Sequence, residues 1–427
     1  MRRRVATARL VVATALLAAL VFYLVASRRR AARLQRSLAL QSSINRILGN
    51  TISAHTPSLQ DSLSCLTRGT WKLAERQHSR LKRTKPASYT FSPSCPVFTS
   101  TADLCASLAG KHIVLIGPET TYYLHTLWLA ALEAHENRFI TCYGPEFCGF
   151  HHVCRSANST APFKKFPHQE DLIASNSSVI RYVLSTTLHA DPNPKAKAYT
   201  QPTIDPATGV RAKNAYWIKH AKHAHVVIMN RGPLPAPPWT YEGAATGGDW
   251  AFTDKLYLDR ATPHLDDDDD DNNNNVHSLS VRITNAALHA TLTAFLPDTL
   301  RALAVLGKHA SARHSLMWHG SWYRSSRCTA KMPFLVEDPL NPLSMIDPWS
   351  LYYNAQGRVA NQIMEAIMPH YGGVFYAPGI PEEPSGVQRE HVGDCLMYPA
   401  TTAYGGAMQR SFLNAVARLV DATRKDD

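Results

Sequence analysis

The sequence predicts an α/β protein whose main domain is a three-layer sandwich, with a mostly parallel sheet between two layers of helices. Short apolar segments alternate along the chain with longer segments whose apolar residues recur at helical spacing. The short segments are continuously apolar, as in strands that are buried on both faces of a parallel sheet. Hydrophobic residues make up 45% of the 427 residues, which is enough for a large core.

The net charge of +12 is concentrated at the start of the chain. Nine arginines lie within the first 36 residues, which contain no Asp, Glu or Lys. The remaining residues carry a net charge of only +3. A broad basic face for a phosphate backbone is therefore not indicated, and we do not expect a nucleic-acid partner.

A membrane segment is expected at residues 10–26, an uninterrupted run of 17 uncharged residues. A helix of this length covers roughly 25 Å, the short end of what spans a bilayer. A cleaved signal peptide is the alternative, but Arg28, Arg29 and Arg30 follow directly and favour an uncleaved anchor. We predict a cytosolic tail at 1–9 and a single-pass, type II signal anchor. A short span suits early secretory membranes, so we expect the endoplasmic reticulum or Golgi.

Two sequons favour a luminal orientation for the rest of the chain. Asn158 and Asn176 each begin an Asn-x-Ser/Thr pattern, which marks glycosylation in secreted proteins. Residues 27–94 are polar with few apolar residues and predict a stem, with a helix near Leu34–Leu48. The luminal domain is expected at 95–427. The Asp/Asn run at 266–275 predicts a solvated loop rather than a cation site, because it lacks the glycine and terminal glutamate of a calcium loop.

The eight cysteines predict disulfide bonds in an oxidising lumen. Cys142, Cys148 and Cys154 are spaced by five residues and enclose His151 and His152, which raises the alternative of zinc. Ligand pairs in structural zinc sites are usually about two to four residues apart, so disulfides are favoured. We expect no metal and no cofactor.

The elements of the domain follow in chain order. Strands are predicted at Lys111–Gly117, Phe139–Tyr143, His225–Met229, His314–Trp318 and Gly373–Tyr376. Helices are predicted at Thr121–Asn137, Ser278–Leu306, Trp349–Met368 and Ala403–Ala422. Chemistry in parallel sheets gathers at the carboxyl ends of the strands. The candidate positions therefore follow Ile116, Met229 and Trp318, together with the loop before the last helix.

Three ordered blocks resemble the SGNH/GDSL-type esterases, especially the branch of trichome-birefringence-like and fungal PC-esterase proteins. The stretch Ile113–Thr121 is similar to the family's first block, a strand running into Gly-Asp-Ser. The stretch Val226–Gly232 is similar to its strand ending in Asn-x-Gly. The stretch Gly393–Tyr398 is similar to its Asp-x-x-His block, and Ser350–Ile380 to its penultimate helix and strand. The resemblance covers about 95–427.

The resemblance implies four site residues, and two of them depart from the family. Asn230 stands at the oxyanion position and Asp394 at the acid of Asp-x-x-His. Glu119 stands where the family has its serine nucleophile, and Met397 where it has its histidine base. Acyl transfer needs a hydroxyl and a neutral imidazole that takes its proton. Loss of both predicts loss of the family's chemistry.

Three substitutes for the missing groups are considered. Thr120 or Thr121 provides a hydroxyl, although each lies past the turn position. His391, three residues before Asp394, provides an imidazole. Glu119 and Asp394 together provide a carboxylate pair for a different hydrolysis. Against these stand structural roles: Glu119 as a carboxylate at a helix N-terminus, Met397 as core packing and Asn230 as a loop cap.

Aromatic residues follow two of the strand ends and suggest a sugar-binding groove, although core packing is the commoner role of tryptophan. They are Trp239, Tyr241, Trp318, Trp322 and Tyr323. We predict a catalytically degenerate, glycan-binding or scaffold protein of the secretory pathway. The alternative is an active glycan O-acetyltransferase or acetylesterase acting on polysaccharide.

Overall fold

The computed structural model describes ten stretches of the chain: 57–73, 89–97, 100–143, 149–156, 168–204, 211–233, 284–309, 315–324, 348–380 and 396–424. All of them belong to one compact unit, His55–Asp427. The expected anchor at 10–26, the stem helix, Asn158, the loop at 266–275, His391 and Asp394 lie outside these stretches. None of the helices within them is long and apolar enough to cross a membrane.

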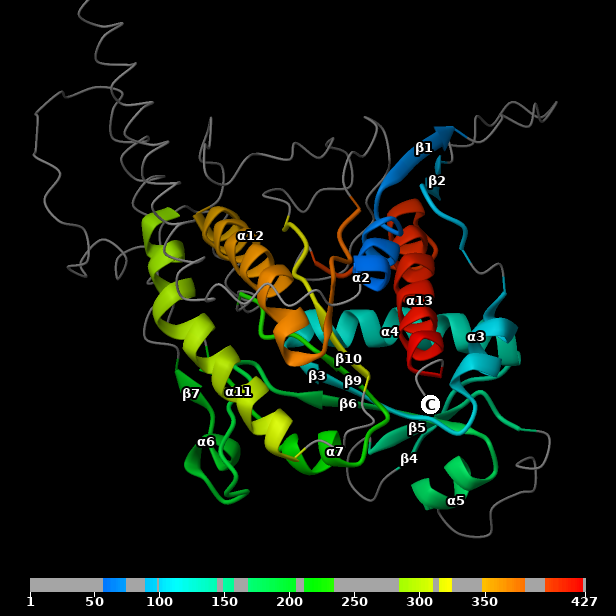
Figure 1. The fold of residues 1–427 in the computed structure, drawn as a ribbon, viewed down its shortest axis with the longest axis horizontal. Helices are drawn as coiled ribbons and strands as arrows, with labels where there is room; N and C mark the ends of the chain where they lie inside the picture. The colour runs from blue at the N-terminus through cyan, green and yellow to red at the C-terminus, as the bar shows by residue number, and fades with distance from the viewer. Residues whose placement is uncertain are drawn as a thin grey trace, which may run out of the picture. The chain divides into compact units, whose positions relative to one another are not determined.

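The centre of the domain is a seven-stranded sheet with strand order β11-β10-β9-β3-β6-β5-β4 (Figure 1). The first five strands of this order pair in parallel, and β5 and β4 are antiparallel. The strands are β3 (His112–Gly117), β4 (Cys142–Tyr143), β5 (Phe150–Val153), β6 (Ser178–Leu184), β9 (Val226–Met229), β10 (Ser315–His319) and β11 (Val374–Tyr376). The predicted fold class, α/β with a mostly parallel sheet, is confirmed.

Helices cover both faces of the sheet, as neighbouring residues of β10 show. Met317 belongs to the apolar cluster shared with α4 (Glu119–Glu136) and α13 (Ala403–Arg424). Trp318 points to the opposite face and packs against Phe295, in the turn η3 (Thr291–Phe295) before α11 (Leu296–His309). The other elements are α3 (Thr101–Leu108), α5 (Gln169–Ala174), α6 (Lys197–Thr200), β7 (Thr203–Ile204), β8 (Arg211–Ala212), α7 (Ile218–Lys222), α12 (Pro348–Ile367) and η4 (Met368–Tyr371).

The C-terminal part of the predicted stem belongs to the domain, which corrects the boundary at residue 95. Residues 57–93 include α2 (Pro57–Ser64) and a hairpin of β1 (Gly69–Leu73) and β2 (Tyr89–Pro93). Leu63, Leu66 and Phe91 are buried in the main apolar cluster. A disulfide joins Cys65 to Cys95. The stem prediction relied on the low apolar content, whereas the few apolar residues present are concentrated where α2 meets α13.

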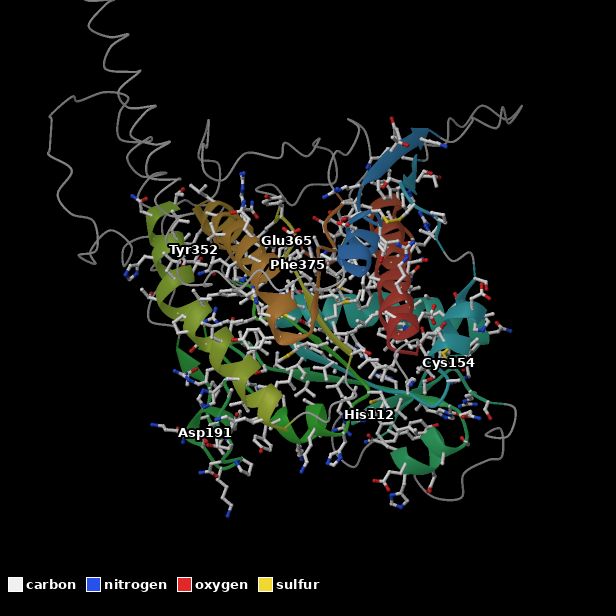
Figure 2. The ribbon with its side chains drawn as sticks, in the orientation of Figure 1. His112, Cys154, Asp191, Tyr352, Glu365 and Phe375 are labelled. Atoms are coloured by element: carbon white, nitrogen blue, oxygen red, sulfur yellow. A yellow bond between two sulfur atoms is a disulfide. The ribbon has the colours of Figure 1, made fainter. Side chains whose placement is uncertain are left out.

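α2 also closes one edge of the sheet. Gln60 donates from Nε2 to the carbonyl of Phe375 at 2.7 Å, and its Oε1 accepts from the N–H of Phe375 at 2.9 Å. Without this contact, the N–H and the carbonyl of Phe375 would be open to pairing with another chain, as at any free strand edge. The side-chain amide of Gln60 therefore makes the two hydrogen bonds to Phe375 that an adjacent strand would make. Phe375 is labelled in Figure 2.

Two strand predictions need correction. The segment Phe139–Tyr143 forms a strand only at Cys142–Tyr143, and Phe139 is 89% exposed. Strand β6 was not predicted, although it pairs with β3 along the whole length of β3. Its interior contains Arg181, whose charge hides the apolar pattern, and that guanidinium lies 3.2 Å from Nε2 of His220.

The cysteines form disulfides within the described residues, as predicted over zinc. Cys105 of α3 pairs with Cys154 at the end of β5, with 5.0 Å between their Cα atoms. Cys142 is also disulfide-bonded. Cys142 and Cys154, two of the three cysteines with this spacing, are therefore engaged in disulfides.

Candidate functional site

The candidate site lies where the direction of the chain's crossovers reverses. After β3 the chain builds β6 on one side, and after β9 it builds β10 on the other. β3 and β9 are neighbours in the sheet, so the reversal falls between their carboxyl ends (Figure 1). Such switch points are where open α/β sheets bind ligands. Glu119, Thr121 and Asn230 follow these two strand ends, as the sequence predicts.

Gly117 allows the close approach of strand and helix at this point. A Cβ atom added to Gly117 would lie 2.1 Å from Oγ1 of Thr121 and 2.7 Å from the carbonyl oxygen of Asn230. Neither distance is possible for a real side chain. The glycine of the first sequence block is therefore required by the packing of Thr121 and of β9 against the strand end.

Glu119 is exposed and is the first residue of α4. A carboxylate there interacts favourably with the unpaired N–H groups and the dipole of the helix. The phenol of Tyr182 lies beneath this turn and donates to the carbonyls of Gly117 and Pro118, at 3.1 Å each. Burial raises the pKa of Tyr182, and the charge of Glu119 raises it further, so the phenol stays a donor at neutral pH. Glu119 therefore presents a carboxylate to solvent at the expected nucleophile position.

Thr121 is hydrogen-bonded to a histidine that the sequence analysis did not select. Its Oγ1 lies 2.8 Å from Nε2 of His319, the last residue of β10. Burial lowers the pKa of His319 to about 4, so the imidazole is neutral at pH 7. Its Nδ1 lies 3.1 Å from the carbonyl of Gly320, which only accepts. Nδ1 therefore carries the proton, Nε2 accepts, and the hydroxyl of Thr121 donates.

This hydroxyl and imidazole have the donor and acceptor arrangement of a nucleophile and its general base, but both are enclosed. Thr121 and His319 each have 0% of their surface exposed. A substrate carbonyl has to come within about 3 Å of a nucleophile to react. In this arrangement the pair holds the start of α4 to the end of β10, two strands away.

Asn230 is also engaged in structure. Its Nδ2 donates to the carbonyl of His319 at 2.6 Å, and the residue is only 1% exposed. Gly232 follows at a φ of 23°, and a Cβ there would lie 2.5 Å from Oδ1 of Asn230. Among the residues that the structure describes, this Oδ1 has no hydrogen-bond partner. Nδ2 of Asn230 thus links the loop after β9 to the end of β10.

The remaining predicted residues contribute less to this site. Met397 is half-buried, between the buried Leu396 and Tyr398. Thr120 is buried, and its hydroxyl has no partner within the described stretches. Asp394 and His391 lie outside them, so a carboxylate partner for Glu119 is not described.

Two of the aromatic residues that follow the strand ends pack in the core, the commoner role considered for them. Trp318 and Trp322 are buried core residues, 1% and 2% exposed. The indole of Trp322 donates to the carbonyl of Leu396 at 2.9 Å, which ties the segment after β10 to the segment before α13. Tyr323 is half-buried, and Trp239 and Tyr241 lie outside the described residues. In place of these, Tyr122 is 43% exposed beside Glu119 and contacts Tyr182, with 5.3 Å between ring centroids.

His319 had a weak signal in the sequence. It directly follows the apolar segment predicted as a strand, at a carboxyl end where chemistry was expected. Its pairing with Thr121 joins residues 198 positions apart. That pairing depends on the order of β3, β9 and β10 in the sheet, which cannot be predicted from a local sequence pattern.

Comparison with known proteins assigns no family to the chain. No protein-family model matches it, and no curated protein matches it. Among solved structures, it is similar to the extracellular lipase of Streptomyces rimosus at 10% sequence identity. The match covers 70% of this chain and 97% of the lipase, with a TM-score of 0.30. At that level the likeness carries no conclusion about activity.

Proposed function

We propose that this chain is a catalytically degenerate protein of the SGNH/PC-esterase-like class, which binds a glycan or serves as a scaffold. The single observation that carries the proposal is the exposed carboxylate of Glu119 at the nucleophile position. A carboxylate there repels the negative charge that develops on a substrate oxygen during acyl transfer. The hydroxyl of Thr121, which could otherwise serve as a nucleophile, is enclosed with His319.

The proposed setting is the lumen of the secretory pathway. The apolar run at 10–26 would anchor the chain, with the endoplasmic reticulum or Golgi as the compartment. Disulfides such as Cys65–Cys95 and Cys105–Cys154 suit an oxidising compartment. Asn176 is exposed, which suits a glycosylated sequon.

The proposal is tested by ester hydrolysis. The full-length chain would be assayed on a small chromogenic acetyl ester and on acetylated polysaccharide. A variant with Glu119→Ser and Met397→His restores the two missing groups and runs beside it. We expect no hydrolysis above background by the natural chain. Activity that is lost in Glu119→Ala would contradict the proposal.

A second candidate is favoured by the 2.8 Å contact between Thr121 and His319. If the residues that enclose Thr121 moved aside, its Oγ1 could attack an acyl carbonyl while Nε2 of His319 takes its proton. The alcohol that leaves would recover that proton, and water or a sugar hydroxyl would then accept the acyl group. This glycan O-acetyltransferase or acetylesterase would retain activity in Glu119→Ala and lose it in Thr121→Val.

A further inference from the structure

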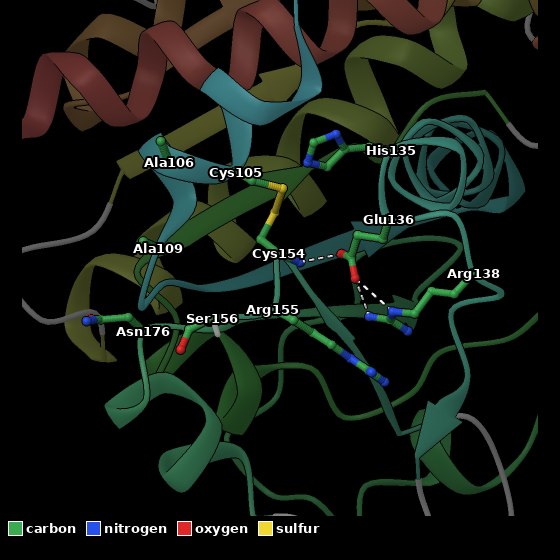
Figure 3. A pocket seen from close by; sticks show the side chains of 10 residues that line it. All are labelled: Cys105, Ala106, Ala109, His135, Glu136, Arg138, Cys154, Arg155, Ser156 and Asn176. Carbon is green, nitrogen blue, oxygen red and sulfur yellow. Dashed lines mark hydrogen bonds and ion pairs between the residues drawn. A yellow bond between two sulfur atoms is a disulfide. The ribbon is translucent and has the colours of Figure 1, made fainter. Parts of the chain in front are cut away.

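A second feature, away from the candidate site, is a pocket beside the Cys105–Cys154 disulfide. It has a volume of about 550 Å³. Its walls come from α3, the last turn of α4, the end of β5 and the turn before β6 (Figure 3). Because α4 begins at Glu119 and its 18 residues span roughly 27 Å, the pocket and Glu119 lie at opposite ends of that helix. The pocket is therefore separate from the candidate site.

The charges that line the pocket do not cancel. Oε1 of Glu136 accepts from the N–H of Cys154 at 2.7 Å, and its Oε2 accepts from Nε of Arg138 at 2.8 Å. Arg138 also donates to the carbonyl of His152 at 2.9 Å. This carboxylate is thus fully engaged, as Figure 3 shows. Arg155 is exposed in the same pocket and has no ion pair among the residues that the structure describes.

Polar groups suited to a sugar stand around this cation. Ser156 and the exposed Asn176 provide a hydroxyl and an amide, and His135 provides an imidazole. The methyl groups of Ala106 and Ala109 provide a small apolar surface in the pocket. Pockets that hold small ligands have volumes of about 300–1,000 Å³ and a few polar groups that fix orientation. This one has room for one or two sugar rings.

We infer that this pocket binds the anionic substituent, sulfate or carboxylate, of an acidic glycan. Arg155 supplies the charge, because a guanidinium can direct two N–H groups at two oxygens of either a carboxylate or a sulfate. Ser156 and Asn176 bind ring hydroxyls. The inference deepens the proposed function, since it rests on the chain binding a glycan and names the kind of glycan.

The disulfide keeps the walls of the pocket together. Cys105 lies on α3 and Cys154 follows β5, so the bond joins two elements that the sheet alone does not connect. Cys154 has a φ of 47°, in the left-handed region that non-glycine residues rarely adopt. This turn directs the next residue, Arg155, into the pocket wall.

Asn176 introduces a competing occupant. It begins a sequon and lines the pocket, so a glycan attached to it would lie over the same surface. The experiment therefore needs the chain with and without that attachment.

The test is a titration of the full-length chain with fluorescent oligosaccharides of one length that are sulfated, uronic-acid-containing or neutral. We expect an anionic probe to bind at least about tenfold more tightly than the neutral one, with affinity that falls as salt rises. Arg155→Ala should remove about tenfold in affinity, and Arg155→Lys should retain part of it. Arg68→Ala, an exposed arginine on another surface, is the matched control and should change nothing.

Each outcome separates the possibilities. Preference for sulfate or for carboxylate identifies the source of the charge. Binding seen only in the chain made in a host that attaches no N-linked glycan, and abolished there by Arg155→Ala, supports the pocket with the attached glycan as competitor. Equal binding of neutral and anionic probes, unchanged in Arg155→Ala, overturns the inference but leaves glycan binding standing. No binding by the chain with or without that attached glycan overturns the inference, and ester hydrolysis by the natural chain would contradict the proposed function as well.

Discussion

At the carboxyl end of β3, the distance between the strand and α4 depends on a glycine. Gly117 brings the backbone of the strand against Thr121 and Asn230. The hydroxyl of Thr121 then reaches His319, whose carbonyl holds Asn230. The sequence selected Gly117, Thr121 and Asn230, because strand ends in a parallel sheet are recognisable locally. It did not select His319, whose role depends on which strand lies where.

Gly117→Ala should therefore destabilise the fold. The new Cβ would overlap Oγ1 of Thr121 and the carbonyl oxygen of Asn230, so backbone has to move. Overpacking of this kind costs about 1–3 kcal/mol or more. The measurement is the free energy of unfolding in urea. Gly307→Ala is the control, since a Cβ there meets nothing within 4 Å in a helix and should stabilise by about 0.5–1 kcal/mol.

Thr121→Val tests the bond to His319 directly. The change keeps the shape of the side chain but leaves the buried Nε2 without its donor, which costs about 1–3 kcal/mol. Thr121→Ser keeps the hydroxyl and should lose less. Equal stability of Thr121→Val and the natural chain, by the same urea measurement, would show that the hydrogen bond is not structural.

At the scale of elements, two histidines at the amino end of the sheet are held neutral. His112 begins β3 and His220 lies on α7, both at the amino end of the sheet, where Figure 2 labels His112. Burial, with a smaller contribution from the charge of Arg181, lowers the pKa of His112 to about 4 and that of His220 to about 3. His220 accepts from Arg181 through Nε2, so protonation breaks that contact.

These shifts predict acid sensitivity. Because the folded-state pKa values lie below the ordinary value of 6.5, the unfolded chain binds more protons as pH falls. The free energy of unfolding should be highest above pH 6.5 and fall between pH 6.5 and about 4. His220→Gln keeps an acceptor without a titrating group and should flatten this fall by up to about 1.4 kcal/mol per pH unit. The exposed His370→Gln should leave the slope unchanged, as followed by urea unfolding at several pH values.

The elements that the sequence predicted well are those with uninterrupted apolar patterns. β3, β9, β10, β11 and the helices α4, α11, α12 and α13 all correspond to predicted segments. β6 was missed because Arg181 interrupts its pattern, although the strand lies beside β3. A charge inside a buried strand is accommodated by a tertiary partner, here His220, and such a partner is invisible to a local pattern.

At the scale of the whole molecule, the domain extends further toward the N-terminus than composition indicated. Arg418 of α13 donates to the carbonyls of Ser62 and Pro96, on either side of the Cys65–Cys95 disulfide. The segment that reads as a stem therefore completes the core. Its contribution comes from a few well-placed apolar residues, and the mean apolar content of residues 27–94 does not reveal them.

A chain that begins at residue 95 should consequently be much less stable than one that begins at residue 55. It lacks Leu63, Leu66 and Phe91, and full burial of each such side chain contributes about 1.5–3 kcal/mol. It also lacks the Cys65–Cys95 crosslink, which closes a loop of 30 residues and contributes about 3–4 kcal/mol. Thermal unfolding of the two chains compares them. Equal midpoints would restore the stem assignment.

The central claim is that the candidate site, among the residues that the structure describes, offers no accessible acyl nucleophile. The most direct test treats the full-length chain with a fluorophosphonate probe, which forms a covalent adduct with activated serine or threonine hydroxyls, and locates any adduct by mass spectrometry. The enclosed pair of Thr121 and His319 predicts no adduct under conditions that label an active esterase completely. An adduct on Thr121 that disappears in Thr121→Val would contradict the claim and establish the acyl-transfer alternative.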